Sequence, residues 1–209
     1  MTAPADLGFD PARLARLPAR IAADIEARRY DGAALCVSRR GEIVYRDVHG
    51  YADREAGRPL TLDDTFVSFS VGKQFANVIV LQRVENGDLW LDMPVCEVLP
   101  EFGGRGLREI KLWHLLTHTS GIMSAIPGVA PEVLTNISKL TAWIASQRPE
   151  SLPGEAVNYS IIAAHSVMAE MVLRAEGHTR SFTDVLREDL FDLRPGVAVR
   201  PSGIGPRHA

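Results

Sequence analysis

The stretch FVSFSVGKQFANVIVLQRVENGDLWLDMPVCEVLPEF, residues 66–102, places a serine three residues before a lysine. An extended apolar run gives way there to apolar residues at helical spacing, which predict a helix from Lys73 to Glu85, closed by Asn86 and Gly87. The chain has three lysines and twelve serines, and chance would give such a pair in about one in six chains of this composition. The spacing alone is therefore a weak signal.

Ser70 and Lys73 have the arrangement that a nucleophilic serine requires. Residues three apart on a first helical turn share one face, within hydrogen-bonding reach. Lys73 could take the serine proton only as a neutral amine, which burial among Phe69, Val71 and Phe75 would favour. The helix amino terminus would stabilise an oxyanion at Ser70. The structural alternative is a capping serine followed by a solvated lysine.

The composition is that of an ordinary globular protein. The chain has 209 residues, of which 46% are hydrophobic and 23% charged. A net charge of −3 and scattered arginines offer no basic surface for nucleic acid or an anionic membrane. We expect a cytoplasmic protein, because the amino terminus lacks a signal-peptide pattern and no segment is long and apolar enough to span a membrane. Cys36 and Cys96 are expected as reduced core thiols.

The remaining pattern predicts an α+β chain that folds as one domain. Asp10 is expected to cap a first helix, which Pro18 should kink or restart. AALCVS and IVYRDVHGYA flank the turn RRGE, and Gly41 in that turn favours a β-hairpin. Ser181 opens the last helix with a capping box completed by Asp184. Further helices are predicted at about 131–147, 160–176 and 181–190.

Three segments of the chain resemble the serine hydrolases related to class C β-lactamases, including family VIII esterases and D-amino-acid peptidases. Residues 66–102 are similar to the family's nucleophile helix and its Gly-x-Leu-x-Leu-Asp-x-Pro-Val segment. IKLWHLLTHTSGI, residues 110–122, resembles the Leu-Leu-x-His-x-Ser-Gly segment. PGEAVNYSIIAAHSVMAEMVLRAEG, residues 153–177, resembles the Pro-Gly-x-x-x-x-Tyr-Ser-Asn helix. The similarity runs from about residue 10 to about residue 196.

The resemblance implies a β-lactamase/transpeptidase-like fold, with helices around a mainly antiparallel sheet, and three catalytic residues. Ser70 would be the nucleophile, and Lys73 would be its base. Tyr159 would share the serine proton and pass it to the leaving group, a role that nearby cations favour. Ile161 stands where the family carries the polar residue of Tyr-x-Asn. Since isoleucine can neither bind a substrate amide nor help hold Lys73, this departure disfavours β-lactamase activity.

The carboxy-terminal end departs further from the family. The family carries a later Lys-Thr-Gly or His-x-Gly strand, which lines the site and supplies an oxyanion-hole N–H. This chain instead continues after DLFDLRPG as VAVRPSGIGPRHA, which predicts a disordered tail over residues 197–209 after a β-lactamase-related domain over residues 1–196. The chain would keep the amino-terminal hairpin and lack the carboxy-terminal strands. Only the hairpin would then cover the apolar helices, so poor stability is expected.

Two histidines have the spacing of zinc ligands. His114 and His118 are four apart, as on one face of a helix, but a leucine stands where a metalloprotease carries its base, and no third ligand is evident. No metal is therefore expected. The structural reading is that the THTSG turn bonds its own backbone through its hydroxyl groups before Gly121 ends the helix. His165 and His178 are expected on helix surfaces.

The sequence as a whole predicts a serine hydrolase that cleaves small esters, or amides and β-lactams, through an acyl-enzyme, with Ser70, Lys73 and Tyr159 as its catalytic residues. A small ester or amide is the expected partner, without a cofactor, nucleic acid or membrane. Two alternatives stay open. One is a catalytically silent interaction module, and the other is an inactive fragment of a longer hydrolase. A completing or oligomeric protein partner also stays open.

Overall fold

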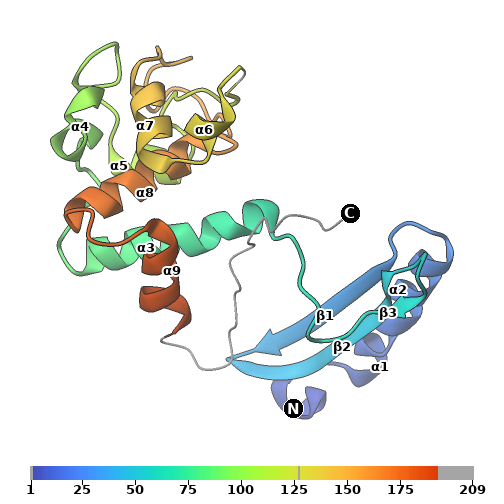
Figure 1. Cartoon of the computed structure of the whole chain (residues 1–209). Coiled ribbons are helices and arrows are strands. Elements are labelled where there is room, and N and C mark those ends of the chain that lie inside the picture. Colours follow the sequence, from blue (N-terminus) through green and yellow to red (C-terminus); the bar gives the residue numbers. More distant parts are fainter. Residues whose placement is uncertain (1, 127, 193–209) are drawn as a thin grey trace. The chain divides into compact units, whose positions relative to one another are not determined.

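The computed structural model describes residues 2–126 and 128–192 and divides into two compact units. The amino-terminal unit is Met1–Val67 and the helical unit is Ser68–Ala209. Figure 1 follows the chain through both. Ser70, Lys73 and Tyr159 all belong to the helical unit. The tail over residues 197–209 and the domain boundary at residue 196 lie outside the described residues and stay predictions.

The amino-terminal unit begins with helices. Its described elements are a 3₁₀ turn, Pro4–Leu7, helices α1 (Pro11–Leu14) and α2 (Arg16–Glu26), and strands β1 (Gly32–Arg39), β2 (Glu42–Asp53) and β3 (Arg58–Pro59). Asp10 caps α1 as predicted, because its carboxylate accepts hydrogen bonds from the backbone N–H groups of Ala12 and Arg13 at 2.8 and 3.3 Å. The helix stops at Leu14 and restarts at Arg16, slightly before Pro18.

The predicted hairpin is confirmed. Strands β1 and β2 pair antiparallel, and β3 adds to β2 to complete the antiparallel sheet of the described residues in the order β1-β2-β3. Arg40 and Gly41 form the turn with φ of 54° and 81°. Two positive φ values give a turn whose twist matches that of the flanking strands, which is why glycine favours this position.

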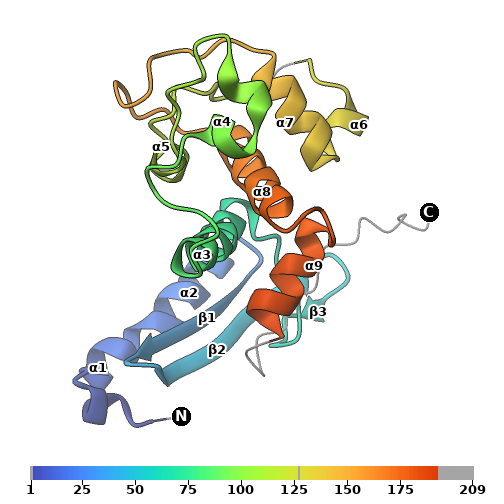
Figure 2. The same ribbon diagram turned by 90° about the vertical axis from the view of Figure 1, so that its left-hand side faces the viewer.

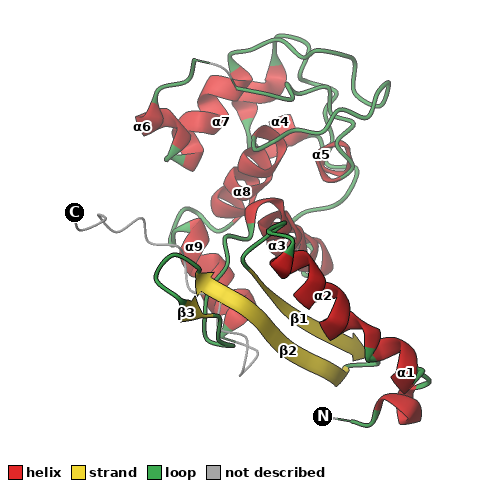
Figure 3. Ribbon diagram, turned by 90° about the vertical axis from the view of Figure 1, so that its right-hand side faces the viewer, coloured by secondary structure: helices red, strands yellow, loops and turns green. Residues whose placement is uncertain are grey.

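Helix α2 packs against the sheet, and a glycine of β2 lies close to the backbone that joins them. Figure 3 shows α2 lying along β1 and β2, and Ile25 of α2 and Val44 of β2 are both buried. Gly50 has a φ of 81°, and a Cβ there would lie 2.3 Å from the Asp31 carbonyl oxygen and 2.9 Å from the Ile25 Cδ1. A side chain at position 50 would therefore clash with the backbone at Asp31, where the chain enters β1.

The two cysteines do not share one environment. Cys36 is exposed on β1, whereas Cys96 is half-buried in the helical unit. Successive residues of a strand face opposite sides of the sheet, and the neighbours Leu35 and Val37 are the more buried ones. The expectation of two core thiols is therefore wrong for Cys36.

The helical unit is built from short helices around two longer ones. Its described elements are a 3₁₀ turn (Phe69–Val71), α3 (Gly72–Glu85), α4 (Val95–Val98), a 3₁₀ turn (Pro100–Gly103), α5 (Leu112–Leu116), α6 (Pro131–Leu134), α7 (Ile137–Ala145), α8 (Ala163–Ala175), α9 (Phe182–Leu186) and a π-helical turn (Arg187–Phe191). The predicted helix over 131–147 is thus two helices, because the Asn136 side chain caps a new one by accepting from the Lys139 N–H at 2.9 Å. The capping box of Ser181 and Asp184 is confirmed.

The helical unit has its own apolar core, with α8 at the centre. Figure 2 shows α3, α4, α5 and α7 around α8, and each of them contacts it. The core includes the fully buried side chains of Ile79, Phe102, Leu112, Leu140 and Met168. The expectation that only the hairpin could cover these helices is therefore wrong for α8, which the other helices bury, whereas Val78 and Leu81 of α3 stay 41% and 48% exposed. No helix among the described residues combines the length and hydropathy that crossing a bilayer requires.

A buried arginine of α3 bonds carboxylates on both sides of α9. Arg83 of α3 is only 7% exposed and bonds the carboxylates of Glu176 and Asp189. The Arg180 Nη2 donates to the same two carboxylates, at 2.9 Å to Glu176 and at 3.0 Å to Asp189. Bonding to Arg180, and then to Arg83, lowers the pKa of Asp189. The network therefore joins α3 to the segments that flank α9.

We predict that Arg83→Ala lowers the free energy of unfolding by about 3 kcal/mol at neutral pH, since it removes one partner of a buried ion pair. The pKa of Asp189 is lowered in the folded state. The stability that its carboxylate contributes is therefore present at pH values above the unfolded pKa of 3.8, and it is lost as the pH falls through the lower folded pKa. Urea unfolding at pH 7 and near pH 3 measures both effects. Arg187→Ala, at an exposed ion pair, is the control and should barely move the midpoint. Equal effects of the two substitutions would contradict the prediction.

Candidate active site

Ser70 lies in the 3₁₀ turn that runs directly into α3. The turn spans Phe69–Val71, and α3 begins at Gly72. The sequence suggested that Ser70 lies in the first turn of the α-helix, but it lies just before that helix. The continuous turn still brings Ser70 and Lys73 together, and the Lys73 Nζ donates to the Ser70 Oγ at 3.2 Å. The side chain of Ser70 is exposed and therefore open to a substrate.

Tyr159 reaches the same oxygen from a distant part of the chain. It lies in the loop before α8, 89 residues from Ser70, and its hydroxyl donates to the Ser70 Oγ at 2.7 Å. The Lys73 Nζ lies 5.1 Å from the centre of the Tyr159 ring. The three residues that the sequence singled out are thus in mutual contact within the helical unit.

The electrostatics of this cluster favour proton transfer at Tyr159. Interaction with the Lys73 amine, and then with the Ser70 hydroxyl, lowers the pKa of Tyr159 from its ordinary value of 10.0. A lowered pKa makes the phenolate more accessible near neutral pH, which suits a group that accepts and returns a proton.

The surroundings of Lys73 differ from the expected apolar cover. Phe69 and Val71 are 85% and 61% exposed, so the expectation that they bury Lys73 is wrong. Phe75 is half-buried and packs edge-on against Phe191, with ring centroids 5.2 Å apart. Lys73 itself is half-buried.

The backbone immediately before Ser70 is strained. Phe69 has a φ of 42°, in the region that favours glycine. Such a conformation costs on the order of 1–3 kcal/mol and persists only where surrounding structure imposes it. The strain falls one residue before Ser70, where it fixes the direction in which the 3₁₀ turn presents the serine.

The two histidines with zinc-ligand spacing lie in different local structures. Helix α5 ends at Leu116, and His118 has a φ of 57°, so the two histidines do not share a helical face as their spacing suggested. The His114 Nδ1 accepts from the Lys111 N–H at 2.9 Å, and the His118 Nδ1 accepts from the Ser160 N–H at 3.2 Å. No group of three histidine, cysteine, aspartate or glutamate side chains that could hold a metal ion occurs among residues 2–126 and 128–192.

His118 instead holds the segment that carries Tyr159. Its carbonyl oxygen accepts from the Asn158 N–H at 2.8 Å, and its ring nitrogen accepts from the Ser160 N–H, so it grips the backbone on both sides of the tyrosine. The two rings lie 4.7 Å apart. Burial, and then the charge of Lys73, lowers the pKa of His118, which keeps the ring neutral and its Nδ1 able to accept.

The rest of the THTSG turn supports the same loop. The Thr117 hydroxyl donates to the Trp113 carbonyl at 2.8 Å and the Ser120 hydroxyl accepts from the Ile122 N–H at 3.3 Å, whereas the Thr119 hydroxyl bonds only that of Thr117. The predicted backbone bonding therefore holds for two of the three hydroxyl groups. Gly121 has a φ of 72°, and a Cβ there would lie 2.1 Å from the Ser151 carbonyl oxygen. The Gly121 carbonyl accepts from the Glu150 N–H at 2.8 Å. Glycine is therefore required for the turn to pack against the loop, although the helix ends before it.

His165 is not the surface residue that the sequence suggested. Its Nε2 lies 3.0 Å from the Asn77 Oδ1, and its Nδ1 is buried without a hydrogen-bond partner. Burial, and then the charges of His118 and Lys73, lowers the pKa of His165 to about 4. The ring is therefore neutral at pH 7, and its Nε2 is the nitrogen placed to donate to Asn77. The sequence carries no local signal for this contact, because Asn77 lies on α3 and His165 on α8.

Comparison with known proteins identifies the group to which this fold and site belong. The sequence profile described as Beta-lactamase matches residues 17–207. The chain belongs to this beta-lactamase family, as the resemblance of its motifs implied. It is 45% identical over 124 residues to "Esterase EstB" of Burkholderia gladioli, a match that covers 57% of this chain and 32% of that protein.

Solved structures confirm the β-lactamase/transpeptidase-like fold. A family VIII carboxylesterase superimposes with a TM-score of 0.75 and 27% identity, covering 83% of this chain and 47% of that chain. A penicillin-binding protein homologue from Caulobacter crescentus gives a TM-score of 0.78 and 26% identity, covering 89% of this chain and 50% of that chain. The chain therefore spans half or less of the length of these relatives.

We predict that Tyr159 ionises at a lower pH than an ordinary tyrosine, because its pKa is lowered. Because the Lys73 cation favours the phenolate, Lys73→Met should move this step to higher pH, and Tyr159→Phe should remove it. Ultraviolet absorbance of the phenolate, followed across an alkaline titration, measures the step. Lys139→Met, at an exposed position on α7, is the matched control. An unchanged step in Lys73→Met would show that the lysine does not act on Tyr159.

His118→Gly should displace Tyr159 while suiting the local backbone, since glycine tolerates the positive φ. The Tyr159 ionisation should then return toward its ordinary pKa, because the hydroxyl loses its contacts with Lys73 and Ser70. His114→Ala is the matched control, because it removes the same kind of bond to a backbone N–H at the start of α5. It should lower stability and leave the tyrosine titration unchanged. If Tyr159 ionises at the same pH in His118→Gly and in His114→Ala, a positioning role for His118 is refuted.

Proposed function

We propose that this chain carries the catalytic residues of a serine hydrolase that cleaves small esters through an acyl-enzyme. One observation carries the proposal: the Ser70 Oγ accepts hydrogen bonds from both the Lys73 Nζ, at 3.2 Å, and the Tyr159 hydroxyl, at 2.7 Å. A serine becomes a useful nucleophile when a neighbouring group takes its proton, and here two such groups contact its oxygen. Relatives named as an esterase and a carboxylesterase support the reaction class.

The proposed reaction has two halves. In the first, the Ser70 Oγ bonds to the ester carbonyl carbon, the Tyr159 phenolate, which the Lys73 cation favours, takes the serine proton, and Tyr159 passes this proton to the alcohol oxygen as the C–O bond breaks. In the second, water attacks the acyl-enzyme, its proton passes to the same groups, and the bond to Oγ breaks. Ser70 recovers its proton and the carboxylic acid departs.

Esters are proposed over β-lactams because of Ile161. Its side chain is 54% exposed and lies two residues after Tyr159. An amide substrate would bring N–H and C=O groups that need partners, and a hydrocarbon side chain offers none. A simple ester carries no such amide and loses less at this position.

A second candidate function is a protein-interaction module. Several apolar side chains near the site are exposed, and Phe69 and Val157 reach 85% and 79%. Exposed apolar groups of this kind are typical of surfaces that another polypeptide covers. Ser70-dependent ester turnover by the purified chain would favour the hydrolase, whereas stoichiometric co-purification of a partner without turnover would favour the module.

We predict that a fluorophosphonate probe labels Ser70 and that Ser70→Ala abolishes the labelling. Lys73→Ala and Tyr159→Phe should each slow labelling by about 10²–10⁴-fold, the usual contribution of a proton-transfer group. Mass spectrometry of the labelled peptide gives the position. Ser68→Ala, two residues away in the chain, is the control and should label normally. Labelling that survives in Ser70→Ala would overturn the assignment of the nucleophile.

The Ile161 argument predicts that short p-nitrophenyl esters are turned over faster than nitrocefin, a β-lactam. Ile161→Asn should shift the ratio of the two kcat/KM values toward nitrocefin, because the amide side chain supplies a donor and an acceptor. Leu152→Asn, at another exposed apolar position, controls for general polarity. Efficient nitrocefin hydrolysis by the unchanged chain would show that Ile161 does not set this preference.

A further inference from the structure

Three side chains of β2 bring their polar atoms together in the amino-terminal unit. The Tyr45 Oη lies 3.3 Å from the Asp47 Oδ2 and 3.3 Å from the His49 Nε2. The distance from the His49 Nε2 to the Asp47 Oδ2 is also 3.3 Å. A phenol oxygen, a carboxylate oxygen and an imidazole nitrogen therefore form an equilateral triangle, and none of the three belongs to the candidate active site.

The regular pairing of β2 places these three side chains on one face of the sheet. Alternate residues of a strand share a face, and β2 pairs with β1 without a register shift from Tyr45 to Gly50. A Cβ at Gly50 would lie 2.9 Å from the Ile25 Cδ1 of α2. The triangle therefore lies on the opposite face of the sheet from α2, the helix that Figure 3 shows along the strands.

The neighbouring strand adds hydrocarbon beside the triangle. The three residues of β1 that pair with it are apolar and half-buried: Ala33, Leu35 and Val37. The Asp47 Oδ1 accepts from the Val48 N–H at 2.9 Å, which fixes the carboxylate that presents Oδ2 to the triangle. Within the described residues no lysine or arginine forms an ion pair with Asp47. The carboxylate is thus oriented by the protein and still lacks a permanently charged partner.

The sides of the triangle suit a metal ion better than they suit hydrogen bonds. A hydroxyl that donates to a carboxylate normally lies about 2.5–2.7 Å from it, so 3.3 Å is long for the bond from Tyr45 to Asp47. Zn²⁺ binds nitrogen and oxygen ligands tetrahedrally at about 2.0–2.1 Å, which separates neighbouring ligand atoms by about 3.3–3.4 Å. Cu²⁺ prefers a square-planar set, in which the ligand atoms lie closer together. A zinc ion would therefore fit the triangle without movement of the strand.

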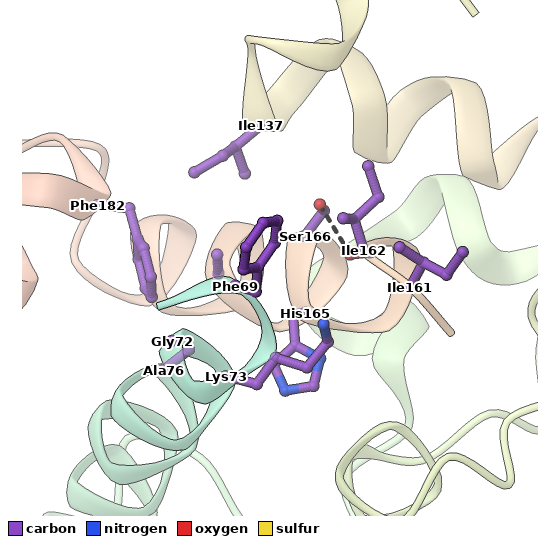
Figure 4. Close-up of a pocket in the computed structure, with 11 residues that line it drawn as sticks. Phe69, Gly72, Lys73, Ala76, Ile137, Ile161, Ile162, His165, Ser166 and Phe182 are labelled. Atoms are coloured by element: carbon purple, nitrogen blue, oxygen red, sulfur yellow. Dashed lines mark hydrogen bonds between the residues drawn. The ribbon is translucent and has the colours of Figure 1, made fainter. Parts of the chain in front are cut away.

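His49 differs from the other histidines of the described chain in facing both a carboxylate oxygen and a phenol oxygen. His165 lines an apolar pocket beside Lys73 (Figure 4), and its Nε2 pairs with an asparagine of α3 at 3.0 Å. His178 faces a single carboxylate, that of Glu170, at 3.3 Å. The pair on α8 and its following turn thus has the same spacing as the triangle but lacks the third atom.

We propose that Tyr45, Asp47 and His49 bind a Zn²⁺ ion, with the fourth coordination position open to water. Three protein ligands and one exchangeable ligand are a common arrangement of zinc in proteins. The Asp47 side chain is 49% exposed, so the ion can enter from solvent. This site is independent of the proposed hydrolase. The sequence did not indicate it, because alternate residues of a strand have neither the zinc-finger nor the metalloprotease spacing.

Isothermal titration calorimetry of the untagged full chain with Zn²⁺ measures the site and should give one ion per chain. Asp47→Asn and His49→Ala should each weaken binding by at least about 100-fold, since even partners outside the ligand set are worth 10–100-fold. Tyr45→Phe removes only the phenol oxygen and should weaken binding by about tenfold. His178→Ala is the matched control, because it removes a histidine that faces one carboxylate at the same distance, and it should leave the affinity unchanged.

A second control excludes binding to a thiol. Cys36 of β1 pairs with Arg46, one residue before Asp47, and therefore lies on the other face of the sheet. Cys36→Ser should leave both the affinity and the stoichiometry unchanged. Loss of binding in Cys36→Ser, or binding that is equally tight in Asp47→Asn and His49→Ala, would overturn the proposal. Failure of the unchanged chain to bind Zn²⁺ at micromolar concentrations would do the same.

Co²⁺ tests the geometry, because four-coordinate Co²⁺ absorbs visible light much more strongly than six-coordinate Co²⁺. The unchanged chain should develop the strong absorption up to one equivalent, and His49→Ala should not, with circular dichroism showing that both are folded. If His49→Ala does not fold, Asp47→Asn, which keeps the shape of the side chain, gives the same test. Weak absorption typical of six-coordinate Co²⁺ in the unchanged chain would refute the tetrahedral site.

Discussion

The candidate site depends on one oxygen atom that accepts two hydrogen bonds. The Ser70 Oγ lies within 3.2 Å of the Lys73 Nζ and 2.7 Å of the Tyr159 hydroxyl. The first contact needs only a turn of chain, whereas the second needs α3 and the start of α8 held at a fixed separation. The buried packing of these two helices, with α5 and α7 against α8, provides that separation. The helical core is thus the part of the fold that the site requires.

The contact with Tyr159 is also fixed from the opposite side. His118 bonds the backbone before and after the tyrosine, and Gly121 lets the same turn approach the loop that precedes it. A loop without such bonds would leave an exposed tyrosine free to change rotamer, and the 2.7 Å bond to Ser70 would be only one of its options. The THTSG turn therefore supports the candidate site, although none of its side chains contacts Ser70 in the described bonds.

Local features were predictable from the sequence, and contacts between distant segments were largely not. The hairpin, the Asp10 cap and the Ser70–Lys73 pair each follow from residues a few positions apart, so propensity and spacing suffice. Tyr159 was identified only through family resemblance. The bonds of His118 and His165 could not be predicted, because each joins segments more than 40 residues apart. The separate helices α6 and α7 were missed because Asn136, which caps the second, also fits a helix interior at modest cost.

Phe69 illustrates a conflict between durability and chemistry. It is an exposed aromatic residue in a left-handed conformation, so random mutagenesis selected for heat resistance should often replace it with glycine or asparagine. The same replacement would take away a wall of the pocket beside Lys73. Selection for thermal tolerance alone would therefore favour a more stable protein with a wider and less selective pocket. A bulky residue retained at position 69 would then indicate selection for substrate selectivity.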